Sequence, residues 1–341
     1  MSKVSFGNRI PNSGPLASPL AMVTVAKASE ALGFDSIWVH DHLTWTKEIH
    51  KTHISSGAEE ALHTNENPDF YEAMTTLAYL AAIVTRVRLG MACLVLPCRN
   101  PIYAAKQVAS LDVMSGGRVD LGVGIGSPAT IHSREYEVLG VDRRARGKMC
   151  DDYVQAMKTI WMTDPSTHHG QFVDFSDAEI FPKPLQTPHP PLWVGGWTEA
   201  AMKRTARLGD GWLPAWLKPV DIGGRFHQVK TMAQDLGRDP DAIALGIEVY
   251  VSIDRDSDRA KRDAIGTFRA SRGTYEREMT LDFLREVSLI GSPAEIRSQI
   301  QAYARAGVSH FETKFIYPTI ERLLEMMRLF SDEVLRHNYA A

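Results

Sequence analysis

The 341-residue sequence has few cysteines, no excess of charge of one sign and no long apolar run. Its three cysteines, Cys93, Cys98 and Cys150, are too few and too irregularly spaced for a disulfide framework or a structural zinc site. Lys plus Arg number 38 against 41 Asp plus Glu, a net charge of −3, so no basic surface for nucleic acid or anionic lipid is expected.

Two further absences concern targeting. No stretch approaches the ~18 consecutive apolar residues of a membrane span. The amino-terminal run MSKVSFGNRIPNSGPL contains Asn, Pro and Gly where a signal peptide needs an uninterrupted apolar segment. These absences favour a cytoplasmic protein whose partner is a small molecule rather than nucleic acid or a membrane.

Short apolar runs alternate with amphipathic segments along the whole chain, which is the pattern of parallel strands joined by crossover helices. Eight such units, with 44% apolar residues, predict a single α/β domain over residues 1–341, a (β/α)8 TIM barrel. The predicted strands are one that begins at Val4–Phe6, then Ser36–Val39, Val87–Leu94, Val119–Val123, Leu192–Val194, Gly211–Leu213, Ile243–Val251 and His310–Phe315.

Local signals predict where helices begin and end. Ser18 followed by Pro19 opens a helix that Gly33 ends, and Asn100 followed by Pro101 opens another. The run Ser292-Pro293-Ala294-Glu295 is a capping box before the last strand.

Three segments exceed what a plain barrel needs, and we predict insertions at about 45–69, 127–144 and 254–288. The first two follow predicted strands, at the carboxyl-terminal face, where barrel loops usually hold substrate. Residues 254–288 are rich in charge and initially weak in apolar periodicity, which indicates an excursion from the barrel. A His-Gly-Gln-Phe turn near Gly170 suggests a small hairpin, and the proline-rich run 181–191 cannot be helical.

Three titratable side chains follow the second predicted strand, in the run Trp38-Val39-His40-Asp41-His42-Leu43-Thr44-Trp45. A histidine next to a carboxylate can be held in one tautomer and tuned for proton transfer near neutral pH. The cluster is therefore a candidate catalytic site; the alternative is a set of solvated loop residues.

His40 and His42 would point to the same side of an extended strand, and a His-x-His pair at a barrel strand end also begins the metal site of metal-dependent hydrolases. Such a site needs further ligands. His132 or His310 with Asp120 could supply them, although nothing in their spacing requires it. A metal-dependent hydrolase is a minor alternative.

Two glycine-rich strand ends are candidate cofactor contacts. Leu121-Gly122-Val123-Gly124-Ile125-Gly126-Ser127-Pro128 allows a planar ring or a backbone to approach closely, but it is not a dinucleotide fingerprint, because Ser127-Pro128 poorly continues into a helix. Leu192-Trp193-Val194-Gly195-Gly196-Trp197-Thr198-Glu199 joins a strand to a capped helix start, whose free N–H groups could bind a phosphate. The alternatives are a steric role for the first run and a plain turn for the second.

Taken together, four blocks in this order resemble the luciferase-like monooxygenase superfamily over nearly the whole barrel. They are Leu32-Gly33-Phe34-Asp35-Ser36-Ile37-Trp38-Val39-His40-Asp41-His42, Arg118-Val119-Asp120-Leu121-Gly122-Val123-Gly124-Ile125-Gly126, Pro188-His189-Pro190-Pro191-Leu192-Trp193-Val194-Gly195-Gly196 and Arg207-Leu208-Gly209-Asp210-Gly211-Trp212. The opening Asn12-Ser13-Gly14-Pro15-Leu16 is most similar to the branch that uses coenzyme F420.

The resemblance implies a homodimer that binds a flavin or deazaflavin at the carboxyl-terminal face. It places Asp41 and His42 beside the reactive ring, with Trp45 close to an indole found there in deazaflavin sugar-phosphate dehydrogenases. It also places a non-prolyl cis peptide at Ala92-Cys93. Gly124 to Ser127, including Gly126, would line the ring, and Gly195, Gly196 and Trp197 would bind phosphate.

One departure is that the dehydrogenases carry a glutamate where this chain has Ser127, which argues against the same sugar-phosphate chemistry. We expect hydride transfer between coenzyme F420 and a small organic substrate, with His42 as proton donor or acceptor and Asp41 orienting it. The main alternative is an FMN-dependent monooxygenase supplied with reduced FMN by a separate flavin reductase. A non-enzymatic flavin-binding protein is a further alternative.

Overall fold

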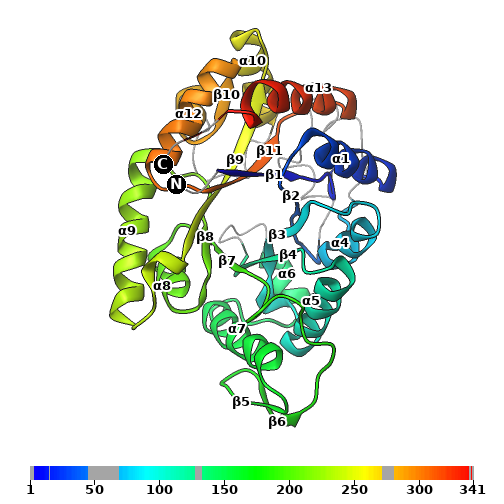
Figure 1. The fold of residues 1–341 in the computed structure, drawn as a ribbon, viewed down its shortest axis with the longest axis vertical. Coiled ribbons are helices and arrows are strands. Elements are labelled where there is room, and N and C mark those ends of the chain that lie inside the picture. The colour runs from blue at the N-terminus through cyan, green and yellow to red at the C-terminus, as the bar shows by residue number, and fades with distance from the viewer. Residues whose placement is uncertain are drawn as a thin grey trace.

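The computed structural model describes residues 4–14, 16–44, 69–126, 133–270, 280–337 and 339, and its centre is a closed barrel of eight parallel strands (Figure 1). Pairing of β8 (Gly211–Leu213) with β9 (Ala244–Ile253) closes the ring. All eight predicted strands are confirmed, with the α/β fold class. They are β1 (Ser5–Arg9), β2 (Ser36–Val39), β3 (Arg88–Val95), β4 (Val119–Gly124), β7 (Leu192–Gly195), β8 (Gly211–Leu213), β9 (Ala244–Ile253) and β11 (His310–Phe315).

Helices surround the barrel, and their ends follow the predicted signals. Ser18 caps α1, and Gly33 ends it in the left-handed conformation with φ 88°. Asn100 caps α5, and the capping box at Ser292 opens α12. The helices around the barrel are α1 (Pro19–Leu32), α4 (Ala73–Ala81), α5 (Pro101–Ser115), α7 (Arg146–Met162), α8 (Glu199–Leu208), α9 (Pro219–Asp235), α12 (Pro293–Arg305) and α13 (Ile320–Phe330), with short turns at Leu96–Cys98, Pro240–Ala242 and Ser331–Leu335.

Alternation along the strands separates two kinds of interior. In β11, Phe311 and Phe315 face the helices and pack in the main apolar core, where Phe311 stacks on Phe6 of β1. The alternate positions of the strand, Glu312 and Lys314, are also buried, and Glu312 is ion-paired with Arg9 of β1. Because side chains alternate along a strand, these polar residues lie on the barrel's inner side.

The amino-terminal end of the barrel is filled by aromatic rings. The ring of His310, at the start of β11, lies 5.3 Å from Trp38 and 5.6 Å from Trp193, centroid to centroid. Glycines make room for the indoles: a Cβ on Gly7 or on Gly90 would come within 2.2 Å of Trp38 atoms. Aromatic side chains therefore fill this end of the barrel, and we expect the functional site at the opposite, carboxyl-terminal end.

Two segments lie outside the regular alternation of barrel strands and helices, and the second is described only in part. The predicted hairpin is β5 (Ser166–His169) paired antiparallel with β6 (Asp174–Ala178). The segment 254–288, predicted as an excursion from the barrel, contains α10 (Ser257–Ala270) and α11 (Leu281–Val287), and β10 (Leu289–Gly291) then adds to β9. The helical signal was weak because α10 packs through small residues, Ala260 and Ala264.

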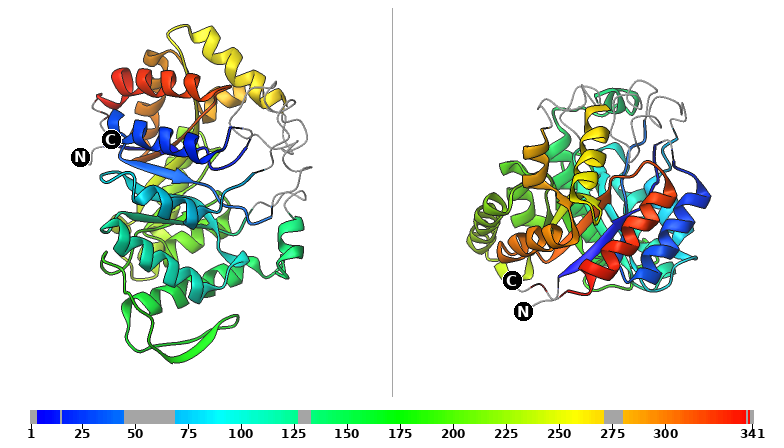
Figure 2. Two further views of the ribbon diagram at one scale, coloured as in Figure 1. Left: turned by 90° about the vertical axis from the view of Figure 1, so that its right-hand side faces the viewer. Right: turned by 90° about the horizontal axis from the view of Figure 1, so that it is seen from above.

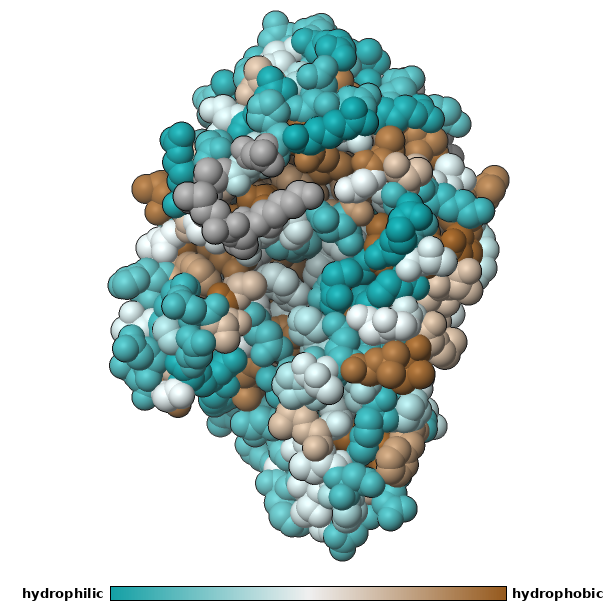
Figure 3. All heavy atoms as spheres, in the orientation of Figure 1, coloured by the Kyte–Doolittle hydropathy of each residue, from teal (hydrophilic) through white to brown (hydrophobic). Residues whose placement is uncertain are grey.

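The helix α6 (Ser133–Val138), within the predicted insertion 127–144, lies on the side of the barrel away from both termini (Figure 2). The insertion predicted at 45–69 falls almost wholly outside the described residues. The surface shown in Figure 3 is largely hydrophilic, with apolar side chains in scattered patches. Among the described helices, none has the length and apolarity to cross a bilayer.

Candidate active site

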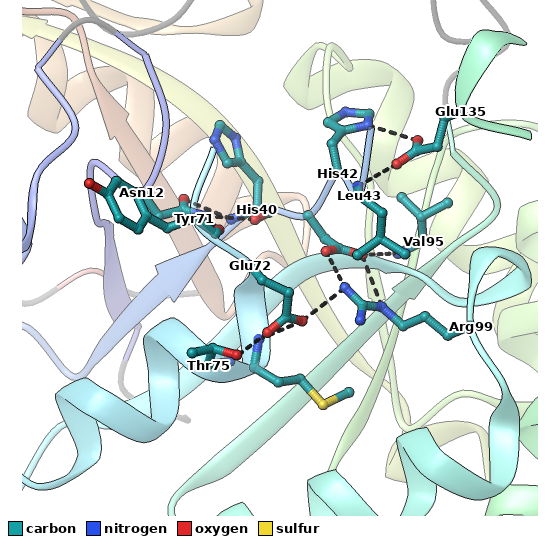
Figure 4. Close-up of polar contacts among 12 residues, drawn as sticks. Asn12, His40, His42, Leu43, Tyr71, Glu72, Thr75, Val95, Arg99 and Glu135 are labelled. Atoms are coloured by element: carbon teal, nitrogen blue, oxygen red, sulfur yellow. Dashed lines mark hydrogen bonds and ion pairs between the residues drawn. The ribbon is translucent and has the colours of Figure 1, made fainter. Parts of the chain in front are cut away.

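Asp41 follows β2 and is buried, with 3% of its surface exposed. Arg99 ion-pairs with its Oδ1, and the Val95 N–H donates to Oδ2 at 2.9 Å. Arg99 also reaches the Glu72 carboxylate at 3.0 Å, so one guanidinium joins two acidic groups (Figure 4). Burial raises the pKa of the Asp41 carboxyl above its ordinary value, and the Arg99 charge opposes that rise.

His42 has a different carboxylate partner. Its Nδ1 lies 3.0 Å from Oε2 of Glu135, which comes from α6 (Figure 4). We predicted that Asp41 orients His42; the oxygens of Asp41 accept from Arg99 and the Val95 amide, and the carboxylate that contacts the imidazole is that of Glu135. The sequence analysis did not single out Glu135, since it lies 93 residues from His42 and no local spacing connects the two.

His40 belongs to another network. Its Nδ1 lies 3.0 Å from Arg9 Nη1, and its Nε2 lies 2.5 Å from Ser13 Oγ. Asn12 donates to the His40 carbonyl at 2.9 Å and to the Tyr71 carbonyl at 3.0 Å. The residues Asn12 and Ser13 thus connect the ends of β1 and β2 to the chain before α4.

The proposed metal ligands are not brought together. His310 lies at the opposite, packed end of the barrel, where its Nδ1 pairs with Ser5 Oγ at 2.8 Å, and Asp120 is ion-paired with Arg88. His132 is outside the described residues. Across the described ranges, no group of three or more His, Cys, Asp and Glu side chains is arranged to hold a metal ion.

A charged network that sequence reasoning missed lies inside the barrel. Arg9 Nε and Nη2 donate to the two oxygens of Glu312, at 2.5 and 2.7 Å, and Nη2 is 2.9 Å from Glu248. Nearby, Lys314 Nζ lies 3.3 Å from the Tyr250 hydroxyl, and burial lowers the pKa of Lys314 to about 8. The sequence signal that could have indicated this network is a charged residue at every second position of β11, Glu312 and Lys314.

The predicted cis peptide is present between Ala92 and Cys93. The Cys93 side chain packs against glycines of the neighbouring strands: a Cβ on Gly195 would lie 2.5 Å from its Sγ, and one on Gly124 would lie 3.2 Å from its Cβ. These two glycines are therefore required by the protein's own packing, whatever else they contact.

The turn after β7 leads directly into α8. Gly196 has φ 98°, a conformation that side chains other than glycine rarely adopt, and a Cβ there would be 3.4 Å from that of Ala201. Thr198 caps α8 by accepting from the Ala201 N–H, and Arg225 donates to the Trp197 carbonyl. The turn thus has the predicted form, a glycine-rich entry to a helix amino terminus.

Two other predicted site residues, Trp45 and Ser127, lie outside the described residues. Gly126, just before Ser127, has φ 72°, and a Cβ there would meet the Tyr136 hydroxyl at 2.0 Å. That hydroxyl donates to the carbonyl of Ile125. The strand end after β4 is therefore bound to α6.

Comparison with known proteins gives a consistent result. Residues 4–310 match the family described as luciferase-like monooxygenase. An uncharacterised protein of Mycobacterium tuberculosis is 31% identical over 253 residues, which are 72% of this chain and 84% of that one. The FMNH2-dependent dimethylsulfone monooxygenase of Pseudomonas putida is 25% identical over 278 residues, 72% of this chain and 74% of its own.

Solved structures show the same fold. An F420-dependent secondary alcohol dehydrogenase, in complex with an F420-acetone adduct, superimposes with a TM-score of 0.79 at 20% sequence identity. The superposition covers 98% of this chain and 100% of the dehydrogenase.

Proposed function

This chain belongs to the luciferase-like monooxygenase family, and from that premise we propose that it transfers a hydride between coenzyme F420 and a small organic substrate. Members of the family are enzymes, and of the proteins compared above the alcohol dehydrogenase depends on F420 and the dimethylsulfone monooxygenase on FMNH2. The fold alone does not choose between the cofactors, because one barrel serves several chemistries.

The observation that carries the proposal is the histidine–carboxylate pair at the carboxyl-terminal end of β2. His42 is mostly buried, with 15% of its side chain exposed, and only 2% of the Glu135 side chain is exposed. Hydride transfer to or from a carbon that bears oxygen requires a proton to leave or join that oxygen. His42 is suited to exchange that proton, because one ring nitrogen of an imidazole can donate or accept a proton while the other is held by a hydrogen bond.

The residues that would hold the cofactor fit it in two places. The Gly196 turn and the start of α8 present backbone N–H groups and the positive end of a helix dipole, which favour a phosphate. Ala92, Cys93, Gly124 and Gly126 lie at the strand ends between this turn and His42 in barrel order, where they would line a ring. Coenzyme F420 bound there would supply the hydride carrier.

One observation supports F420 over FMN. The segment that begins with Asn12 and Ser13, similar to the F420-dependent branch, lies at this end of the barrel and bonds with His40. Residues 45, 127 and the insertions around them would then contribute to the substrate's surroundings, with Trp45 beside the ring.

The alternative is an FMN-dependent monooxygenase, which the Pseudomonas putida relative favours. Such an enzyme would need reduced FMN from a separate reductase, and oxygen as a co-substrate. In either case we propose a homodimer, in line with the family resemblance.

Fluorescence titration with F420 and with FMN tests the proposal. We expect micromolar affinity for F420 and weaker binding of FMN. Tighter binding of FMN, together with oxygen consumption when reduced FMN is supplied, would replace the proposal with the monooxygenase.

A further inference from the structure

Glu135 is a buried acidic group that contacts the end of β2. It is 1% exposed and comes from α6, in the segment after β4. Its Oε2 is 3.0 Å from His42 Nδ1, and its Oε1 accepts from the N–H groups of Leu43 and Thr44 at 2.5 and 3.3 Å. One carboxylate thus holds both the imidazole and the backbone that follows it.

The hydrogen-bond donors around Glu135 favour the ionised form of its carboxylate. Burial raises its pKa, but the hydrogen bonds from His42, Leu43 and Thr44 outweigh burial and lower the pKa below the ordinary value. An ionised carboxylate can only accept hydrogen bonds. His42 Nδ1 must therefore carry the proton in this contact.

We propose that Glu135 is the positioning residue of this site: it holds the proton of His42 on Nδ1, which assigns proton exchange with the substrate to Nε2. The inference rests on the proposed function for the identity of the reaction. The position of the proton on His42 is independent of the proposed function, because it follows from the contact with the ionised Glu135 carboxylate.

Glu135 is held firmly enough for this role. The adjacent Tyr136 is buried, donates to the Ile125 carbonyl and packs with Val95 and Cys98. Its carbonyl accepts from the Val141 N–H at 2.8 Å. The helix is thereby fixed to the ends of β3 and β4, so its carboxylate is presented to His42 from a packed element rather than from a free loop.

Asp41, the neighbour of His42 in sequence, is bound elsewhere. Arg99 and the Val95 N–H occupy its oxygens. The structure gives the positioning role to Glu135 and gives Asp41 the role of joining β2 to the turn after β3.

The test replaces Glu135 with glutamine, using Glu137→Gln as the matched control. Glutamine can still accept from Leu43, but its amide would donate to His42 Nδ1 and force the Nε2–H tautomer. Glu137 lies on the same helix, is exposed and pairs only with Arg134 among the contacts of the described residues. Long-range 1H–15N correlation spectra of the cofactor-free protein, assigned with His42→Ala, identify the tautomer.

We expect the Nδ1–H tautomer in the parent and in Glu137→Gln, and the Nε2–H tautomer in Glu135→Gln. We also expect Glu135→Gln to lower turnover by about two orders of magnitude or more, while cofactor affinity stays within a few-fold. An Nε2–H tautomer in the parent would overturn the proposal, and so would unchanged turnover in Glu135→Gln. Failure to bind F420 would refute the proposed function instead, and it would leave the tautomer result standing.

Discussion

Adjacent residues take different roles at the end of β2. Asp41 is bound by an arginine from the turn after β3, whereas His42 is bound by a glutamate from α6. The next histidine back along the chain, His40, pairs with Arg9 and Ser13. The side chains that are adjacent in the sequence are thus divided among three networks, and in the proposed function His42 is the one that exchanges the proton.

Removal of the imidazole tests that role. We expect His42→Ala to lower turnover by about two to four orders of magnitude, because positioned acid–base groups contribute on that scale. Cofactor affinity should change by no more than a few-fold. Steady-state kinetics with His337→Ala as a surface control checks this, and near-parental turnover would remove His42 from the mechanism.

His310 should make stability depend on pH. Burial between two indoles lowers its pKa from 6.5 to about 4, so the unfolded chain binds the proton more readily than the folded one. As pH falls from about 6.5 to about 4, the free energy of unfolding should therefore fall, by on the order of 3 kcal/mol from this group. Denaturant midpoints at pH 7 and 5 should differ less in His310→Gln than in the parent; equal differences would contradict this.

Some features of the helices have a signal in the local sequence, and others do not. The start and end of α1 and the starts of α5 and α12 were predictable because caps and glycines act within a few residues. The contact of α6 with β2 was not, because it depends on packing between segments 93 residues apart. In α10, small buried residues replace the large apolar ones that periodicity detects.

The packing of aromatic rings at the amino-terminal end of the barrel depends on glycines in the strands. We expect Gly90→Ala to destabilise the protein strongly, or to prevent folding, because the new Cβ would lie 2.2 Å from the Trp38 ring. Gly224→Ala, in α9 with no atom within 4 Å of the new Cβ, is the matched control. It should raise stability by about 0.5–1 kcal/mol, as alanine does in an exposed helix. Equal stability of the two variants in thermal unfolding would refute the packing argument.

The turn before α8 can be tested for phosphate binding. Gly196→Val should reduce cofactor affinity tenfold or more, about 1.4 kcal/mol or above, since a side chain at φ 98° displaces the turn. Gly237→Val provides the control, with a similar strain at φ 75° but no neighbour within 4 Å. If both folded variants bind cofactor as the parent does, the phosphate lies elsewhere.

On the scale of the whole molecule, the strand order gathers the ends of eight strands around one centre. The alternation of strands and helices was sufficient to predict this, and with it the common position of the glycine turns and the β2 cluster. It was not sufficient for the pairs made across the barrel. Arg9 and Glu312 are 303 residues apart, and only closure of the ring brings them within hydrogen-bond distance.

The central claim is that the carboxyl-terminal face holds a deazaflavin beside His42, with its phosphate at the Gly196 turn. A crystal structure of the protein with F420 tests this most directly. We expect the ring next to His42 and Cys93 and the phosphate within hydrogen-bond distance of backbone N–H groups at Gly196 and Trp197. F420 bound away from this face, for example in the groove of about 590 Å³ formed by α7, α8 and α9, would contradict it.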